Sequence, residues 1–127
     1  MLRQILDNLV LFSFDQEALM NQFKSIEINH NKFATYLKKQ RNLREHFEHV
    51  DDSLFAVALR NPMISEVILN EVGEIHYNLD KSLETLADNN VFKGVSHQQY
   101  TLTSANKLAD FLSDVQNNMQ MQMQAQG

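Results

Sequence analysis

Apolar residues recur every three or four positions along most of the chain, which is the spacing of one face of an α-helix. The clearest stripe, Ile64–Leu86, predicts a helix over residues 62–88. A second stripe predicts either one long helix or two stacked helices over residues 31–60. Asn61-Pro62 separates the two stripes, because proline donates no backbone hydrogen bond and suits the first position of a helix.

The first 26 residues predict two shorter helices. A stripe over residues 2–12 predicts a short N-terminal helix, which we expect to end where Ser13-Phe14-Asp15 interrupts the pattern. Asp15 is expected to cap a second helix over residues 15–26, because a carboxylate accepts hydrogen bonds from the free amides of a first turn. Asp51-Asp52-Ser53 is the other candidate break, since these residues favour helix ends over interiors.

A last helix is expected to begin at Ser96, because Ser96 and Gln99 have the form of a capping box. A connector over residues 89–94 precedes it. Past Val115 the sequence turns to repeated Met-Gln pairs, and both residue types favour helix. We therefore expect residues 116–127 to form a helical extension or linker.

These elements predict an all-α fold, a bundle of four principal helices plus the short N-terminal helix and the low-complexity C-terminal helical extension. Residues 1–115 would form the bundle domain. A length of 127 residues suits one domain, and three glycines and one proline are too few for a turn-rich β fold. The absence of cysteine excludes disulfides, thiol nucleophiles and thiolate metal sites.

The charge pattern argues against nucleic acid and membrane insertion. The net charge is −5, and no apolar run approaches the roughly 20 residues of a membrane span. The basic cluster is small and is interleaved with Glu45 and Glu48, which weaken its field. Its members are Lys38, Lys39, Arg41 and Arg44.

The densest polar cluster offers an alternative, metal-binding function. Glu45, His46, His49 and Asp52 combine imidazole and carboxylate groups on neighbouring helix faces, as a Zn²⁺ or di-iron site requires. The spacing matches neither His-Glu-x-x-His nor the paired Glu-x-x-His of di-iron bundles. A solvated helix face is the favoured interpretation, and no cofactor is expected.

Catalytic motifs are absent from the sequence, which contains neither Gly-x-Ser-x-Gly nor a glycine-rich phosphate loop. His76 and Tyr77 flank the apolar stripe, where we expect a buried His–Tyr hydrogen bond or an interface contact. Gly73 in the middle of a helix suggests a close helix crossing. We expect a protein that is not an enzyme.

Exposed aromatic and methionine side chains are the candidates for protein contact, because apolar patches beyond the needs of a monomer mark interaction sites. The candidates are Phe12, Phe14, Phe55, Phe92, Met119, Met121 and Met123.

Three segments, Leu2–Leu9, Phe47–Ala56 and Gln98–Ala109, resemble a stretch of certain long, uncharacterised Bacteroidota proteins that have N-terminal membrane spans and an extended helical region. The resemblance covers most of the chain and implies a helical domain of an envelope-associated protein, with Met119–Gly127 as the start of a Gln, Met and Gly-rich region. It implies no site residues.

The sequence thus favours a non-catalytic interaction or scaffolding module that binds a protein partner or another region of a parent chain. A homo-oligomer is compatible with this interpretation. One alternative is the metal-binding bundle described above, acting as a metal-dependent enzyme or a metal sensor. The other is a small acidic secretion chaperone, by analogy of class alone.

Overall fold

The computed structural model describes residues 2–26 and 31–126, with side chains as far as residue 119. The fold consists of α1 (Leu2–Ser25), α2 (Phe33–Arg60), α3 (Pro62–Ala87) and α4 (Val91–Gln126). No strand lies within the described ranges, and the expected all-α helical bundle is confirmed.

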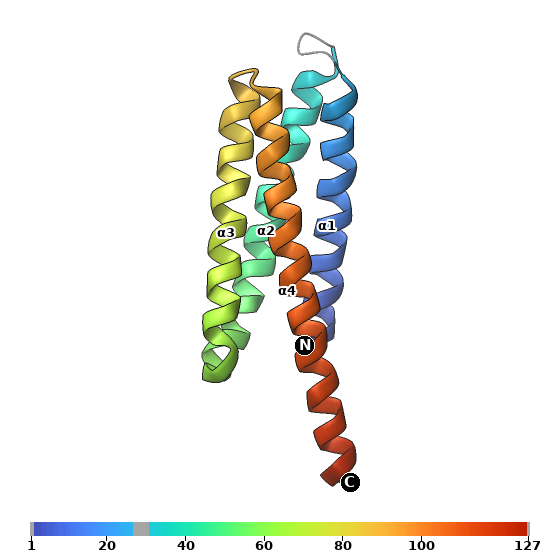
Figure 1. The fold of residues 1–127 in the computed structure, drawn as a ribbon, viewed down its shortest axis with the longest axis vertical. Coiled ribbons are helices and arrows are strands. Elements are labelled where there is room, and N and C mark those ends of the chain that lie inside the picture. The colour runs from blue at the N-terminus through green and yellow to red at the C-terminus, as the bar shows by residue number, and fades with distance from the viewer. Residues whose placement is uncertain (1, 27–30, 127) are drawn as a thin grey trace.

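The four helices run alternately up and down and close into a ring (Figure 1). α1 and α3 each pack against both α2 and α4, so every helix contacts its two neighbours in the ring. One continuous apolar core fills the axis. Its fully buried large side chains are Leu9, Phe12, Phe23, Phe47, Leu54, Ile68, Ile75, Leu79, Leu86, Leu108 and Leu112.

α1 is one helix, so the prediction of a separate short N-terminal helix was wrong. Ser13 does not break it, because the Ser13 hydroxyl donates to Asn106 Oδ1 on α4 at 2.7 Å. Gln16 keeps the core stripe in phase between Phe12 and Leu19 and is fully buried. The stripe looked interrupted only because a polar side chain occupies one core position.

α2 is also continuous, so Asp51-Asp52-Ser53 is not a break. Asn61 alone connects α2 to α3. Its side-chain amide donates to Val57 O at 2.9 Å and so caps the C-terminus of α2. Pro62 then occupies the first turn of α3, as the sequence predicts.

The turn between α3 and α4 differs from the prediction, because α4 begins at Val91 rather than at Ser96. Asn89 takes a φ of 63°, and the backbone amides of Asn89 and Asn90 donate to Leu86 O and Thr85 O, which is a Schellman motif. Asn90 Oδ1 then accepts from the Lys93 amide and caps α4. The Ser96 hydroxyl donates to Phe92 O within the helix, so the predicted capping box does not form.

The close approach expected at Gly73 occurs at Gly94 instead. A Cβ built on Gly73 meets open space, whereas one built on Gly94 would collide with the Leu86 side chain across the α3–α4 pair. The Gly73 prediction was wrong because Gly73 lies on the exposed face of α3.

Candidate functional site

The predicted metal cluster is divided, because His46 faces α1 whereas the other three residues share an exposed face of α2. His46 faces α1, where its ring packs edge-on against Phe12 with 5.9 Å between centroids. Glu45, His49 and Asp52 are exposed on α2. Within residues 2–26 and 31–119, no group of three or more His, Asp or Glu side chains is placed to hold a metal ion. Metal binding remains a hypothesis that metal analysis of the purified protein would test.

Asp51, from the same sequence cluster, instead pairs with α3. Its Oδ2 lies 2.8 Å from Nε2 of His76, and both side chains are partly buried. The His76 ring also packs edge-on against Phe47, with 5.0 Å between centroids. His76 therefore contacts an acid and an aromatic ring of α2, while Tyr77 is exposed and lies beside His97.

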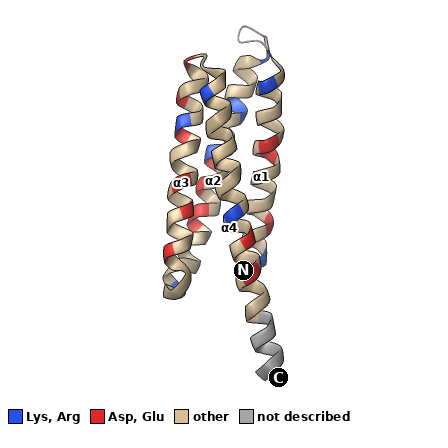
Figure 2. Ribbon diagram, viewed as in Figure 1, with Lys and Arg blue, Asp and Glu red and all other residues tan. Residues whose placement is uncertain are grey.

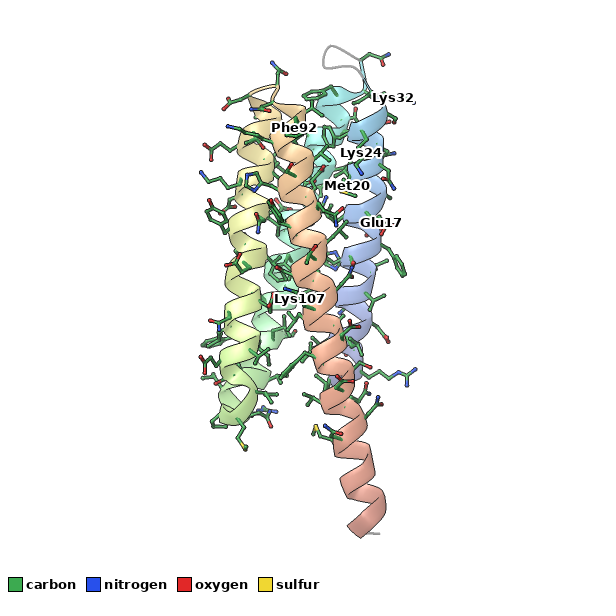
Figure 3. The ribbon with its side chains drawn as sticks, viewed as in Figure 1. Glu17, Met20, Lys24, Lys32, Phe92 and Lys107 are labelled. Atoms are coloured by element: carbon green, nitrogen blue, oxygen red, sulfur yellow. The ribbon has the colours of Figure 1, made fainter. Side chains whose placement is uncertain are left out.

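The predicted contact aromatics do not form one patch. Phe12 was wrongly expected at the surface: it is 0% exposed, because it is a core member of α1. Phe14 and Phe55 are exposed on α1 and α2. Phe92 is exposed at the end of the bundle opposite to the C-terminus (Figure 3). Met121 and Met123 lie outside the described side chains.

The basic cluster on α2 is partly engaged by neighbours. Arg44 lies 3.5 Å from Asp80 of α3, and the Lys39 ammonium lies 5.4 Å from the centre of the Tyr36 ring. Figure 2 shows Lys and Arg mixed with Asp and Glu along the helices. This arrangement is typical of solvated helix faces.

Three fully buried glutamines form a polar layer inside the apolar core. Gln16 and Gln40 donate to each other, at 3.0 and 2.8 Å, and thus join α1 to α2. Gln98 of α4 donates to Gln40 Oε1 at 2.9 Å. The buried Gln98 Oε1 has no hydrogen-bond partner among the described residues. The three glutamines are separated by 24 and 58 positions along the chain, so no local pattern in the sequence indicates this layer.

His97 occupies the α3–α4 interface next to this layer. Its Nδ1 lies 2.9 Å from Asn78 Oδ1, and Nδ1 must donate, since an amide oxygen only accepts. Burial lowers the pKa of His97 below its usual 6.5, and the charges of Lys81 and Lys93 lower it further, while Glu84 opposes them. The neutral imidazole is thus favoured in the folded protein.

A pocket of about 390 Å³ lies at the end of the bundle where the chain begins. All four helices contribute to its wall, together with the Asn61 connection. The lining residues are Leu2, Arg3, Val57, Arg60, Asn61, Ile64, Val115, Gln116 and Met119. We call this end of the bundle, with its pocket, the open end.

Large apolar side chains are exposed around the open end. Leu59 is in the last turn of α2, Met63 is in the first turn of α3, and Met119 lies on the part of α4 that leaves the bundle. Met63 is 98% exposed. Met119 is the one candidate from the Met-Gln segment whose side chain is described, and it is half-exposed at the pocket edge. The open end is the candidate functional site.

No helix within the described residues is long and apolar enough to cross a bilayer. The chain matches no protein-family profile, no curated protein and no solved structure.

Proposed function

We propose that this chain is a non-catalytic protein-interaction module that docks a helix of a partner protein at its open end. The observation that carries the proposal is the overhang of α4. At 1.5 Å per residue its 36 residues span about 54 Å, whereas the 24 to 28 residues of the other helices span about 36–42 Å. Figure 1 shows α4 running past the ends of the other three helices.

A helix without neighbours is marginal in water, because most helical stability in proteins comes from tertiary packing. The overhanging part of α4 therefore gains stability from a partner that packs along it. Past Asp114 the sequence contains no charged residue, so no side-chain charge in this segment would lose its hydration against an apolar partner face.

The exposed side chains of Leu59, Met63 and Met119 supply the apolar contacts for such a partner. Methionine is well suited to this role, because its flexible thioether adapts to differently shaped surfaces. An amphipathic helix laid against α4 and the α2–α3 turn would cover these side chains with anchors spaced three or four residues apart.

The test compares variants at the two ends of the bundle. Purified domain carrying Met63→Asp and Met119→Asp is exposed to extract of the source cell, beside wild type and a Phe92→Asp control at the other end. All three substituted side chains are exposed, so the variants should keep wild-type helicity and melting temperature.

We expect wild type and the Phe92→Asp control to retain the same protein in stoichiometric amount, and the methionine variant to lose it. Equal retention by all three would refute docking at the open end. Retention of no protein, or self-association alone in sedimentation, would refute binding of a separate partner.

A further inference from the structure

We infer that the pocket at the open end binds a small amphiphilic anion, a single apolar chain that ends in a carboxylate. This inference concerns the pocket inside the open end and does not depend on the docking of a partner helix. It rests on three properties of the pocket: its lining, its charge and its position on the bundle axis.

The pocket is lined by apolar side chains and by two cationic side chains. Leu2, Val57, Ile64, Val115 and Met119 supply the apolar wall. Arg3 and Arg60 add guanidinium-bearing side chains, and no Asp or Glu lines the pocket. A volume of about 390 Å³ lies within the range of small-molecule sites, which combine apolar walls with a few polar groups.

Neither arginine has a counter-ion among the side chains that the structure describes. Within the described residues, no hydrogen bond or ion pair engages Arg3 or Arg60, while Arg44 on the same protein does pair with an acid. Arg60 lies in the last turn of α2, where a cation suits the helix dipole. Arg3 lies in the first turn of α1, where a cation opposes it. An anion bound beside Arg3 would relieve this unfavourable placement.

The backbone presents two positive helix ends and one negative end there, because α1 and α3 begin and α2 ends at the open end. α1 and α3 both begin there, and neither carries an acidic residue in its first turn. Asn61, which precedes α3, makes no side-chain hydrogen bond to the first amides of that helix. In a protein of net charge −5, this end is therefore suited to anions.

The position of the pocket at the end of the bundle axis favours a ligand with an extended alkyl chain. Because its wall comes from all four helices, the pocket continues the bundle core toward solvent. An extended alkyl chain inserted from this end would lie against Val57, Ile64 and Val115, and its carboxylate would remain near the arginines at the surface. Guanidinium groups bind carboxylates with two parallel hydrogen bonds.

The experiment titrates purified protein with dodecanoate below its micellar concentration, by calorimetry and by NMR of ¹³C-labelled methionine methyl groups. Met119 lines the pocket, whereas Met20 is buried in the core and serves as the internal control. Matched probes are dodecyltrimethylammonium, with the same tail and opposite charge, and acetate, with the carboxylate alone.

We expect saturable 1:1 binding of dodecanoate, with a shift of the Met119 methyl signal and none at Met20, and at least tenfold weaker binding of the cationic probe and of acetate. The Arg3→Gln/Arg60→Gln protein should lose at least about tenfold in affinity. An Arg44→Gln control should bind as wild type. Ile64→Phe, which fills the pocket, should abolish binding with the fold intact by circular dichroism.

Three results would overturn the inference. They are the absence of saturable dodecanoate binding, equal affinity for the cationic probe, and binding that leaves Met119 unmoved. Vesicles of anionic diacyl phospholipid form a separate arm, and binding to vesicles without binding to dodecanoate would assign the charge to a membrane surface instead.

Discussion

Gln16 and Gln40 exchange two hydrogen bonds across the α1–α2 interface, and neither side chain is exposed to solvent. Gln40 also accepts from Gln98, so a single side chain joins three of the four helices. Antiparallel helices with apolar stripes can slide by a heptad at modest cost, whereas a buried polar pairing is satisfied in one register only. The glutamine layer thus gives the bundle a preferred alignment.

The layer predicts unequal costs for two similar substitutions. Gln40→Leu should lower the free energy of unfolding by at least about 2 kcal/mol, because it leaves groups of both Gln16 and Gln98 buried without partners. Gln98→Met should be close to neutral, because the loss of the Gln98–Gln40 hydrogen bond is offset by the removal of a buried acceptor that lacks a partner, and Gln40 Oε1 still accepts from Gln16. Urea unfolding of the two variants and wild type measures the difference. An equal decrease in the free energy of unfolding for the two variants would show that Gln40 is not the central residue of the layer.

Substitution by alanine should change the stability of the protein in opposite directions at Gly73 and Gly94. Gly73→Ala should raise the free energy of unfolding by about 0.5–1 kcal/mol, because the new methyl group meets open space on an exposed helix face. Gly94→Ala should lower it by about 1–3 kcal/mol, because the methyl group collides with the fully buried Leu86 side chain, which would have to repack within the core. Thermal or urea unfolding checks both, and a stable Gly94→Ala protein would contradict the close α3–α4 contact.

The turn before α4 predicts a backbone effect at Asn89. Asn89→Val should destabilise the protein by about 1–2 kcal/mol, because a β-branched residue is strained at a φ of 63°. Asn89→Gly should be neutral or stabilising, since glycine adopts this conformation without strain. Comparison of the two variants by urea unfolding separates backbone strain from loss of the asparagine side chain.

His97 predicts a dependence of stability on pH. Its folded-state pKa lies below 6.5, so below that pH the unfolded chain binds the proton more readily and the fold loses stability. The loss begins as pH falls through 6.5 and levels off below the folded-state pKa. The groups that face His97 are Lys81, Glu84 and Tyr77 on α3 and Lys93 and Tyr100 on α4.

His97→Gln keeps a side-chain donor near Asn78 and removes the titration. Unfolding free energies measured between pH 5 and pH 8 should therefore fall less steeply for His97→Gln than for wild type on the acid side. Parallel curves for the two proteins would show that burial of His97 is not linked to stability.

The helices followed from the sequence where the core positions are apolar and the ends carry strong signals. α3 was predicted over 62–88 and runs over Pro62–Ala87, because its stripe is unbroken and Pro62 marks its start. The predicted break in α1 failed because Gln16 is a core residue whose hydrogen-bond partner, Gln40, lies 24 positions away in the sequence. The start of α4 was misplaced because Asn90 provides the cap that Ser96 was expected to provide.

The candidate site could not be assembled from the sequence. Leu2, Val57, Ile64 and Val115 come together only when the ends of α1, α2 and α3 pack beside α4, and no local spacing connects them. Conversely, the Glu45–Asp52 segment looked like a site because its residues are neighbours along the chain. In the folded helix, His46 faces α1 and Asp51 faces α3. Residues that are neighbours along the chain therefore contact different helices.

Site-specific photo-crosslinking tests most directly the claim that the open end is the docking surface. p-Benzoylphenylalanine is placed singly at the positions of Met63, Met119 and Phe92, all of which are exposed, and each protein is irradiated in extract of the source cell. If a partner docks at the open end, positions 63 and 119 crosslink to the same protein and position 92 does not. Crosslinking at position 92 with none at 63 and 119 would contradict docking there.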